Sequence, residues 1–238
     1  MKVKSSAEQV LSDNLSYIRD EMANACLKAG RPTDSVQLLA VTKTVSAERI
    51  NAAIELGVTH IGENRVQEFL QKRDALRLDR VQKHLIGHLQ TNKVRQIVGQ
   101  VDMIQSVDSI RLAKAISDRS DYLGIVTPIL VEVNIGGEEA KSGVEPSQLE
   151  SLLGEISLLH GIQVQGLMTV PPILHEECKK REIFSKMYQL FVDIKGKNID
   201  NILMRELSMG MSGDYREAIL EGATIVRIGS AIFGERQY

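Results

Sequence analysis

The amino-acid sequence predicts an α/β fold, a single (β/α)8 barrel of the TIM type. Eight short runs rich in apolar and β-branched residues alternate with seven helix-length amphipathic segments. Because a helix between consecutive strands makes those strands parallel, this alternation favours a closed parallel barrel. An open doubly wound sheet is the competing fold, but it usually has fewer strands, and no GxGxxG motif follows the first predicted strand.

A further helix is predicted ahead of the barrel, at residues 7–29. Ser6 and Gln9 resemble a capping box, apolar residues then recur at helical spacing, and Gly30 ends the pattern. A chain of 238 residues can bury one large core, and barrels of this length often form one domain. We therefore expect residues 1–238 to form a single domain, in which residues 1–36 supply the leading helix and its connection to the barrel.

The expected strands and helices follow one another without an evident linker. The predicted strands cover residues 37–43, 60–64, 84–88, 103–107, 128–134, 164–169, 205–210 and 224–234. The predicted helices between them cover residues 47–57, 66–77, 92–100, 109–120, 146–161, 175–196 and 213–222. Several of these helical segments end at glycine, which is typical of helix C-termini.

Composition argues against several classes of protein. A formal charge of −2 and the absence of tryptophan make a polynucleotide partner improbable. Cys26 and Cys178 form no CxxC pair, so neither a disulfide framework nor a thiolate metal site is indicated, which fits a reducing cytosol. The N-terminus has no apolar signal region, and no run of 18 apolar residues occurs. We expect a soluble, cytoplasmic protein.

Polar residues occupy the C-terminal ends of most predicted strands, where barrels of this kind carry their chemistry. Each of them alone is better explained as a residue leaving the sheet for water. Together they predict a polar ring at one mouth of the barrel. In strand order they are Lys43, Asn64, His88, Asn134, Thr169 and Ser208.

Arg227 interrupts the last predicted strand, TIVRIGSAIF, which is apolar enough to be buried. A guanidinium without an acceptor would be very unfavourable there. Two interpretations are about equally supported. One is a buried ion pair with an acidic residue such as Glu206, and the other is contact with a ligand.

Two glycine-containing turns follow the last two strands, SMGMSG at residues 208–213 and GSAIFG at residues 229–234. Small residues let backbone N–H groups approach a ligand, and the loops after strands seven and eight often bind phosphate in barrels. Asp214 argues against an anion there, unless it caps the next helix on a side turned away from the ligand. Ordinary tight turns are the alternative interpretation.

These features together indicate a phosphorylated aldehyde cofactor held as a Schiff base. Pyridoxal 5′-phosphate (PLP) would use the lysine on the first strand, the arginine on the last and the phosphate site between the final loops. A metal is not indicated, because His84 and His88 have no third ligand at a recognisable spacing. His175 likewise lacks the second histidine of an HExxH motif.

Several segments resemble, in order, the motifs of the pyridoxal phosphate homeostasis protein family. The resemblance runs from about Gln37 to Arg236. One departure is KHLIGHLQ, where the family often has WHFIGHLQ, and it affects only local packing at Lys83 and Leu85. The matching segments are AVTKT, HIGENRVQE, HLIGHLQTNK, VNIGGEEAKSG, GLMTV and LSMGMSGDYREAILEGATIVRIGSAIFGER.

The resemblance implies an alanine-racemase-like barrel without the second, β-rich domain of the racemases. It implies an aldimine between PLP and Lys43, and Arg227 beside the pyridine nitrogen. The implied phosphate contacts come from Ser208, Gly229 and Ser230. Asn64 and Met209 would lie around the cofactor by the same matching. PLP-dependent apo-enzymes become candidate partners.

These implications favour a protein of PLP homeostasis that buffers or delivers the cofactor without turnover of its own. A cation at the pyridine nitrogen disfavours its protonation and so weakens the ring as an electron sink. Racemisation also needs a second base, and nothing in the sequence positions Tyr215 or Tyr238 over the cofactor. Because no second domain follows strand eight, we expect a monomer.

Two alternatives stay open at this point. One is a PLP-dependent amino-acid racemase that uses Lys43 as one base. The other is a cofactor-free barrel enzyme whose final loops bind a sugar phosphate.

Overall fold

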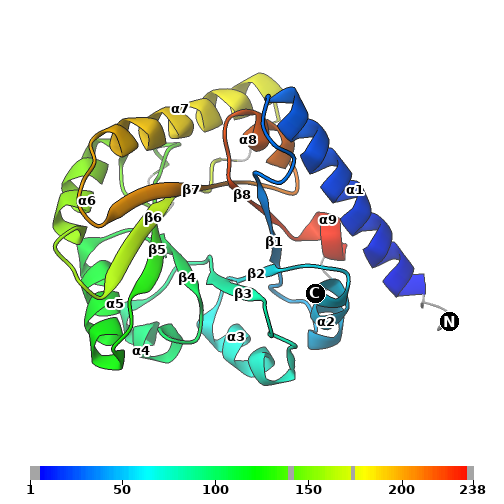
Figure 1. Ribbon diagram of the computed structural model, residues 1–238, viewed down its shortest axis with the longest axis horizontal. Coiled ribbons are helices and arrows are strands. Elements are labelled where there is room, and N and C mark those ends of the chain that lie inside the picture. The colour runs from blue at the N-terminus through cyan, green and yellow to red at the C-terminus, as the bar shows by residue number, and fades with distance from the viewer. Residues whose placement is uncertain (1–5, 139–141, 173–174, 235–238) are drawn as a thin grey trace.

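The computed structural model describes residues 6–138, 142–172 and 175–234. Within them, eight parallel strands close into a barrel in the order β1 to β8, with the helices outside (Figure 1). The predicted (β/α)8 fold is confirmed. The strands are β1 Gln37–Val41, β2 His60–Glu63, β3 Gln82–Leu85, β4 Met103–Val107, β5 Thr127–Glu132, β6 Ile162–Met168, β7 Ile202–Met211 and β8 Ile225–Ile228.

Helices occupy the predicted connections, although several are shorter than expected. The helix expected at residues 92–100 is one of these, because α4 ends before Gly99, whose φ of 82° is left-handed. The helices are α1 Ser6–Lys28, α2 Ala47–Glu55, α3 Val66–Lys72, α4 Val94–Ile97, α5 Ile110–Leu123, α6 Leu149–Ile156, α7 Glu177–Gly196, α8 Tyr215–Leu220 and α9 Ser230–Phe233. Three single 3-10 turns are η1 Arg73–Ala75, η2 Thr91–Lys93 and η3 Pro146–Gln148.

The ends of β7 and β8 also differ from the prediction. Residues 208–211 of the expected SMGMSG turn belong to β7, and the register between β7 and β8 shifts between Ser208 and Met211. β8 stops at Ile228, and α9 occupies residues that the sequence suggested as a continuation of the strand. A short helix therefore starts at the barrel mouth directly after the last strand.

Side chains alternate between the two faces of each strand, so the barrel wall separates two groups of apolar residues. The larger group fills the space between the sheet and the helices and includes Phe184. A small separate group, which we assign to the barrel interior, consists of Leu39, Val41 and Ile225, with Ile86 packed against it. Much of the remaining interior is polar, and this polar region leads to the mouth.

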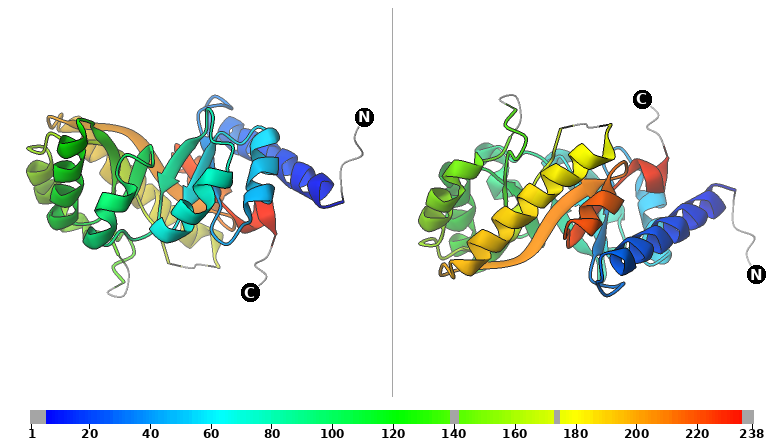
Figure 2. Two further views of the ribbon diagram at one scale, coloured as in Figure 1. Left: turned by 90° about the horizontal axis from the view of Figure 1, so that it is seen from below. Right: turned by 90° about the horizontal axis from the view of Figure 1, so that it is seen from above.

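The N-terminal helix α1 lies along the outside of the barrel next to α8 and α9 (Figure 2). Leu11, Leu15 and Ile18 are buried in the main core, and burial stabilises the fold by roughly 1.5–3 kcal/mol for each such side chain. The Asn14 side-chain amide donates to the Ile232 carbonyl at 3.0 Å, which ties α1 to α9. No described helix is both long and apolar enough to cross a membrane.

Candidate functional site

Lys43, Gly229 and Ser230 meet at one cavity in the barrel mouth. β1 pairs with β8, so the chain that leaves β1 toward Lys43 runs beside the turn that leaves β8. The two turns approach closely, because a Cβ atom at Gly229 would lie only 3.3 Å from the Val41 Cβ. The cavity has a volume of about 780 Å³, and Arg49 also lines it. Three of the sequence-predicted site residues therefore share one space.

Two backbone N–H groups at the start of α9 converge on one oxygen. The N–H groups of Gly229 and Ala231 both donate to the Ser212 hydroxyl oxygen, each at 3.3 Å. N–H groups that point at a common oxygen form the kind of arrangement that binds anions. Ser212 was not among the predicted site residues. Its only signal in the sequence was its position as the second serine of SMGMSG.

Arg227 is buried inside the barrel and is held by oxygen atoms. Its Nη1 donates to the Ser208 hydroxyl at 2.7 Å, and its Nη2 donates to the Thr169 carbonyl at 2.7 Å. The Ser208 hydroxyl in turn donates to Gln105 Oε1 at 2.7 Å, and the Gln105 amide lies 2.8 Å from His84 Nδ1. A hydrogen-bonded chain thus crosses the interior from β3 to β8.

The suggested ion pair between Arg227 and Glu206 is wrong. The Glu206 carboxylate accepts a hydrogen bond from the Thr224 hydroxyl at 2.6 Å, and the ion pairs of the described residues include none between Glu206 and Arg227. A serine hydroxyl and a main-chain carbonyl satisfy the guanidinium instead. Both acceptors are neutral, so neither of them offsets the positive charge of the guanidinium.

Burial dominates the electrostatics of this interior. It lowers the pKa of Arg227 to about 10, although the charges of Glu132 and Asp214 oppose the shift. Burial raises the pKa of Glu132 to about 7, assisted by Asp108 and opposed by Arg227. Burial also lowers the pKa of His84 to about 4. At neutral pH Arg227 is charged, His84 is neutral and Glu132 is close to its titration midpoint.

Asn64 and Met209 lie in different environments. Asn64 follows β2 at the mouth, and its buried Oδ1 has no hydrogen-bond partner. Gly87 packs against it so closely that a Cβ atom there would lie 2.3 Å from the Asn64 carbonyl oxygen. The Met209 side chain is fully buried in the core between sheet and helices. Any contact between Met209 and a ligand would come from its main chain.

The remaining members of the predicted polar ring make local contacts. The Asn134 amide donates to the Glu138 carbonyl at 3.0 Å, and the Thr169 hydroxyl donates to the Val133 carbonyl at 2.8 Å. His88 is exposed, with its Nδ1 atom 3.6 Å from a carboxylate oxygen of the residue that follows β4. The structure therefore does not gather the whole ring around one point.

Asp214 is at the N-cap position of α8, but its side chain does not cap that helix. Its carboxylate accepts the Met211 N–H at 2.6 Å and so closes the turn after β7. Burial raises its pKa, against this hydrogen bond and the charges of Lys180 and Arg227. Of the two tyrosines considered as a second base, Tyr215 is buried in the main core and Tyr238 lies outside the described residues.

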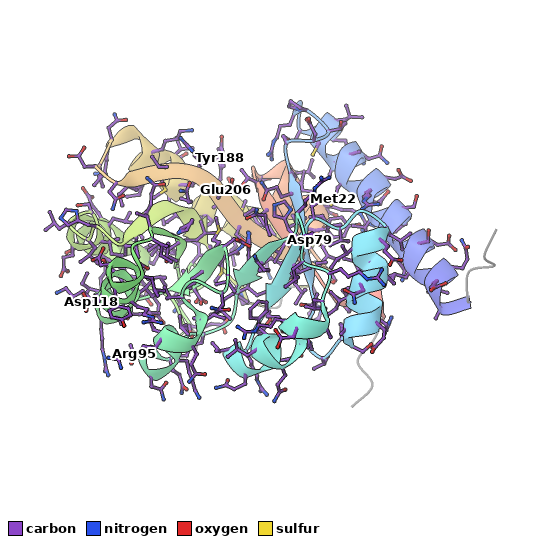
Figure 3. The ribbon with its side chains drawn as sticks, turned by 60° about the horizontal axis from the view of Figure 1, so that its bottom comes forward. Met22, Asp79, Arg95, Asp118, Tyr188 and Glu206 are labelled. Carbon is purple, nitrogen blue, oxygen red and sulfur yellow. The ribbon has the colours of Figure 1, made fainter. Side chains whose placement is uncertain are left out.

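A second cavity of about 510 Å³ lies on the outer side of the barrel wall. Arg95 and Asp118, labelled in Figure 3 on α4 and α5, line it together with Tyr122. None of the sequence-predicted site residues borders this cavity. Among the described residues, no group of three His, Cys, Asp or Glu side chains could hold a metal ion.

The chain is similar to several known proteins. Residues 14–237 match the family model described as alanine racemase, N-terminal domain. The pyridoxal phosphate homeostasis protein of Aquifex aeolicus is 44% identical over 226 residues, covering 95% of this chain and 98% of that protein. A crystal structure of an unknown protein from Bifidobacterium adolescentis has a TM-score of 0.92 at 40% identity and covers 98% of both chains. PipY of Synechococcus elongatus PCC7942, in its structure with PLP bound, has a TM-score of 0.83 at 33% identity, over 94% of this chain and 100% of that one.

Proposed function

This chain belongs to the pyridoxal phosphate homeostasis protein family, and we propose that it binds PLP as a Schiff base on Lys43 and buffers or delivers the cofactor inside the cell. The observation that carries the proposal is the cavity shared by Lys43, Gly229 and Ser230. It puts an amine within the same space as a turn suited to an anion. PLP supplies an aldehyde that condenses with such an amine, and a phosphate that such a turn holds.

The donor set at the mouth fits PLP. The N–H groups of Gly229 and Ala231 reach Ser212 only at 3.3 Å, so a phosphate oxygen would be a stronger acceptor for them. The buried Asn64 Oδ1 lacks a donor that a ligand could supply. Met209 would contribute main-chain contacts, and Ser230 would face the phosphate at the first residue of α9.

In this proposal Arg227 would lie beside the pyridine ring, and Ser208 would contact the phosphate. The Ser208 hydroxyl proton is directed to Gln105, and its oxygen accepts from Arg227. In this state Ser208 orients the guanidinium, and a direct phosphate contact would require it to release Gln105. A permanent cation near the pyridine nitrogen disfavours ring protonation. We therefore propose that the protein holds PLP without turning over a substrate.

The proposal extends to partners and assembly. We propose that PLP-dependent apo-enzymes receive the cofactor, and that the protein works in the cytoplasm as a monomer. The buried contacts of α1 with α8 and α9 support treating residues 1–238 as one domain.

Absorption spectroscopy tests the anchoring residue. The purified protein with PLP should show a band near the visible edge, and borohydride followed by peptide mapping should recover the pyridoxyl group on Lys43. Lys43→Ala should abolish the band, whereas Lys186→Ala, at an exposed lysine of α7, should leave it unchanged. A band that survives in Lys43→Ala would refute the assignment. A protein that takes up no PLP would instead favour a sugar phosphate at the final loops.

Deuterium exchange tests the absence of turnover. Amino acids incubated with the PLP-loaded protein in D2O should keep their α-protons at the rate seen with free PLP. Sustained exchange at enzymatic rates would show that the protein is a PLP-dependent racemase or a related enzyme.

A further inference from the structure

The residue after Lys43 has a strained backbone. Thr44 has a φ of 63°, in the left-handed region that β-branched residues rarely occupy. Such a conformation persists only where the surrounding structure enforces it, and it is most common at functional sites. Thr44 also lines the cavity that contains Lys43.

Two charged side chains of α3 hold the peptide groups that flank Lys43, and a carboxylate of β2 supports one of them. The Thr44 N–H donates to Glu68 Oε1 at 2.5 Å, and the Thr42 carbonyl accepts from Lys72 Nζ at 2.9 Å. Lys72 Nζ also donates to Glu68 Oε1 at 2.6 Å and to Glu63 Oε1 at 3.0 Å. One ammonium and two carboxylates therefore connect the wall of the barrel to the main chain on either side of Lys43.

The three charged side chains of this cluster are partly shielded from water, whereas Thr44 itself is exposed. The exposed fractions of the side chains are 16% for Lys72, 2% for Glu63 and 21% for Glu68. Burial raises the pKa of Glu63, although Lys72 and Thr42 oppose the shift. Burial alone would also raise the pKa of Glu68, but hydrogen bonds from Lys72 and the Thr44 N–H, with the charges of Lys72 and Arg65, lower it overall. Glu68 is therefore the carboxylate that stays ionised and holds Thr44.

We propose that Glu68 and Lys72 are positioning residues that lock the main chain around Lys43 and so set the affinity for PLP. The inference rests on the proposed role of Lys43. Neither side chain needs to touch the cofactor, because each holds a peptide group next to the lysine that does. Lys72 acts in two ways, by fixing the Thr42 carbonyl and by orienting the Glu68 carboxylate.

A double-mutant cycle with Thr44 tests the proposal. Glu68→Met removes the acceptor at similar volume, and Thr44→Gly removes the strain that the acceptor must hold, since glycine adopts a positive φ freely. The PLP dissociation constant of each variant is measured by titrating the apo-protein with PLP and following the absorption band near the visible edge, which borohydride reduction removes. Glu68→Met should weaken PLP binding about tenfold when residue 44 is Thr, and less than about threefold in the Thr44→Gly background.

Matched variants distinguish positioning from general destabilisation. Glu68→Gln keeps an oxygen for the Thr44 N–H and should retain most of the affinity. Glu182→Met disrupts an i,i+4 pair of the same spacing with Lys186, on the exposed face of α7, and should change nothing. If Glu68→Met does not fold, Lys72→Met removes the donor to the Thr42 carbonyl and should weaken PLP binding by a similar factor, of which Thr44→Gly should restore only a part.

The outcomes separate the two proposals. Equal losses with and without the Thr44→Gly substitution, or unchanged affinity in Glu68→Met, would refute the positioning role while leaving PLP on Lys43. A wild-type protein without the band would remove the proposed function and this inference together.

Discussion

Replacing Ser208 with alanine should destabilise the protein more than most single-hydroxyl deletions. The Ser208 hydroxyl is fully buried, accepts from Arg227 and donates to Gln105. Alanine leaves a buried N–H of the guanidinium and a buried amide oxygen without that partner. Of its two hydrogen bonds to described residues, Arg227 would keep the one to the Thr169 carbonyl.

The expected loss follows from these two interactions. A hydrogen bond to a charged group contributes about 1.5–3 kcal/mol, and a neutral one contributes about 1 kcal/mol. The free energy of unfolding should therefore fall by about 3 kcal/mol in Ser208→Ala. With a urea m-value of about 3 kcal/mol/M, the unfolding midpoint would fall by about 1 M.

Urea unfolding of the apo-protein, followed by circular dichroism, measures this shift. The control is Ser157→Ala, which removes one hydrogen bond from an exposed site to the Gly154 carbonyl and should cost under about 0.5 kcal/mol. A midpoint shift in Ser208→Ala no larger than that of the control would show that the guanidinium does not depend on Ser208. The hydrogen-bonded chain from His84 to Arg227 would then not pass through Ser208 in solution.

Two further predictions concern other positions of the site. Because burial lowers the pKa of His84 to about 4, the unfolded chain binds a proton that the folded one excludes between about pH 4 and the ordinary value of 6.5. The raised pKa of Glu132 contributes in the opposite direction over this range, so the His84 contribution is read as a difference between variants. Relative to the wild type, His84→Gln should gain about 2 kcal/mol in its free energy of unfolding between pH 7 and pH 5, measured by urea unfolding, whereas exposed His160→Gln should follow the wild type. Gly87→Ala places a Cβ atom 2.3 Å from the Asn64 carbonyl oxygen, so it should weaken PLP binding about tenfold in a titration of the absorption band. Gly154→Ala, in α6 where nothing lies within 4 Å, should bind PLP as the wild type does, and equal affinities for both variants would count against a role for Asn64.

The barrel was predictable because its signals are local. Alternating strand-like and helical segments gave the element order, and the structure closes them in that order. Boundaries were less predictable at β7, β8 and α4, where register shifts and left-handed glycines override the periodicity. Lys43, Gly229 and Ser230 were identifiable as a group, because strand ends in a closed parallel barrel necessarily meet at one mouth.

The partners of these residues were not predictable. Ser212 has no pattern that separates it from Ser208, yet only Ser212 faces the N–H groups at the start of α9. Glu68 and Lys72 looked like ordinary residues of an amphipathic helix. Their roles depend on contacts between α3 and the main chain that follows β1, which only the folded structure brings together.

The sequence by itself determined the fold, the order of its elements and the two cationic side chains, because periodicity and charge are properties of neighbouring residues. Tertiary structure alone decided how those cations are satisfied. Gln105 and Ser208 are 103 positions apart, and the hydrogen bond between them exists only in the register of the closed barrel. The sequence indicated that the Arg227 guanidinium needs an acceptor, and a carboxylate was one expectation. In the structure its acceptors are a hydroxyl and a carbonyl, because strand register decides which side chains face inward beside it.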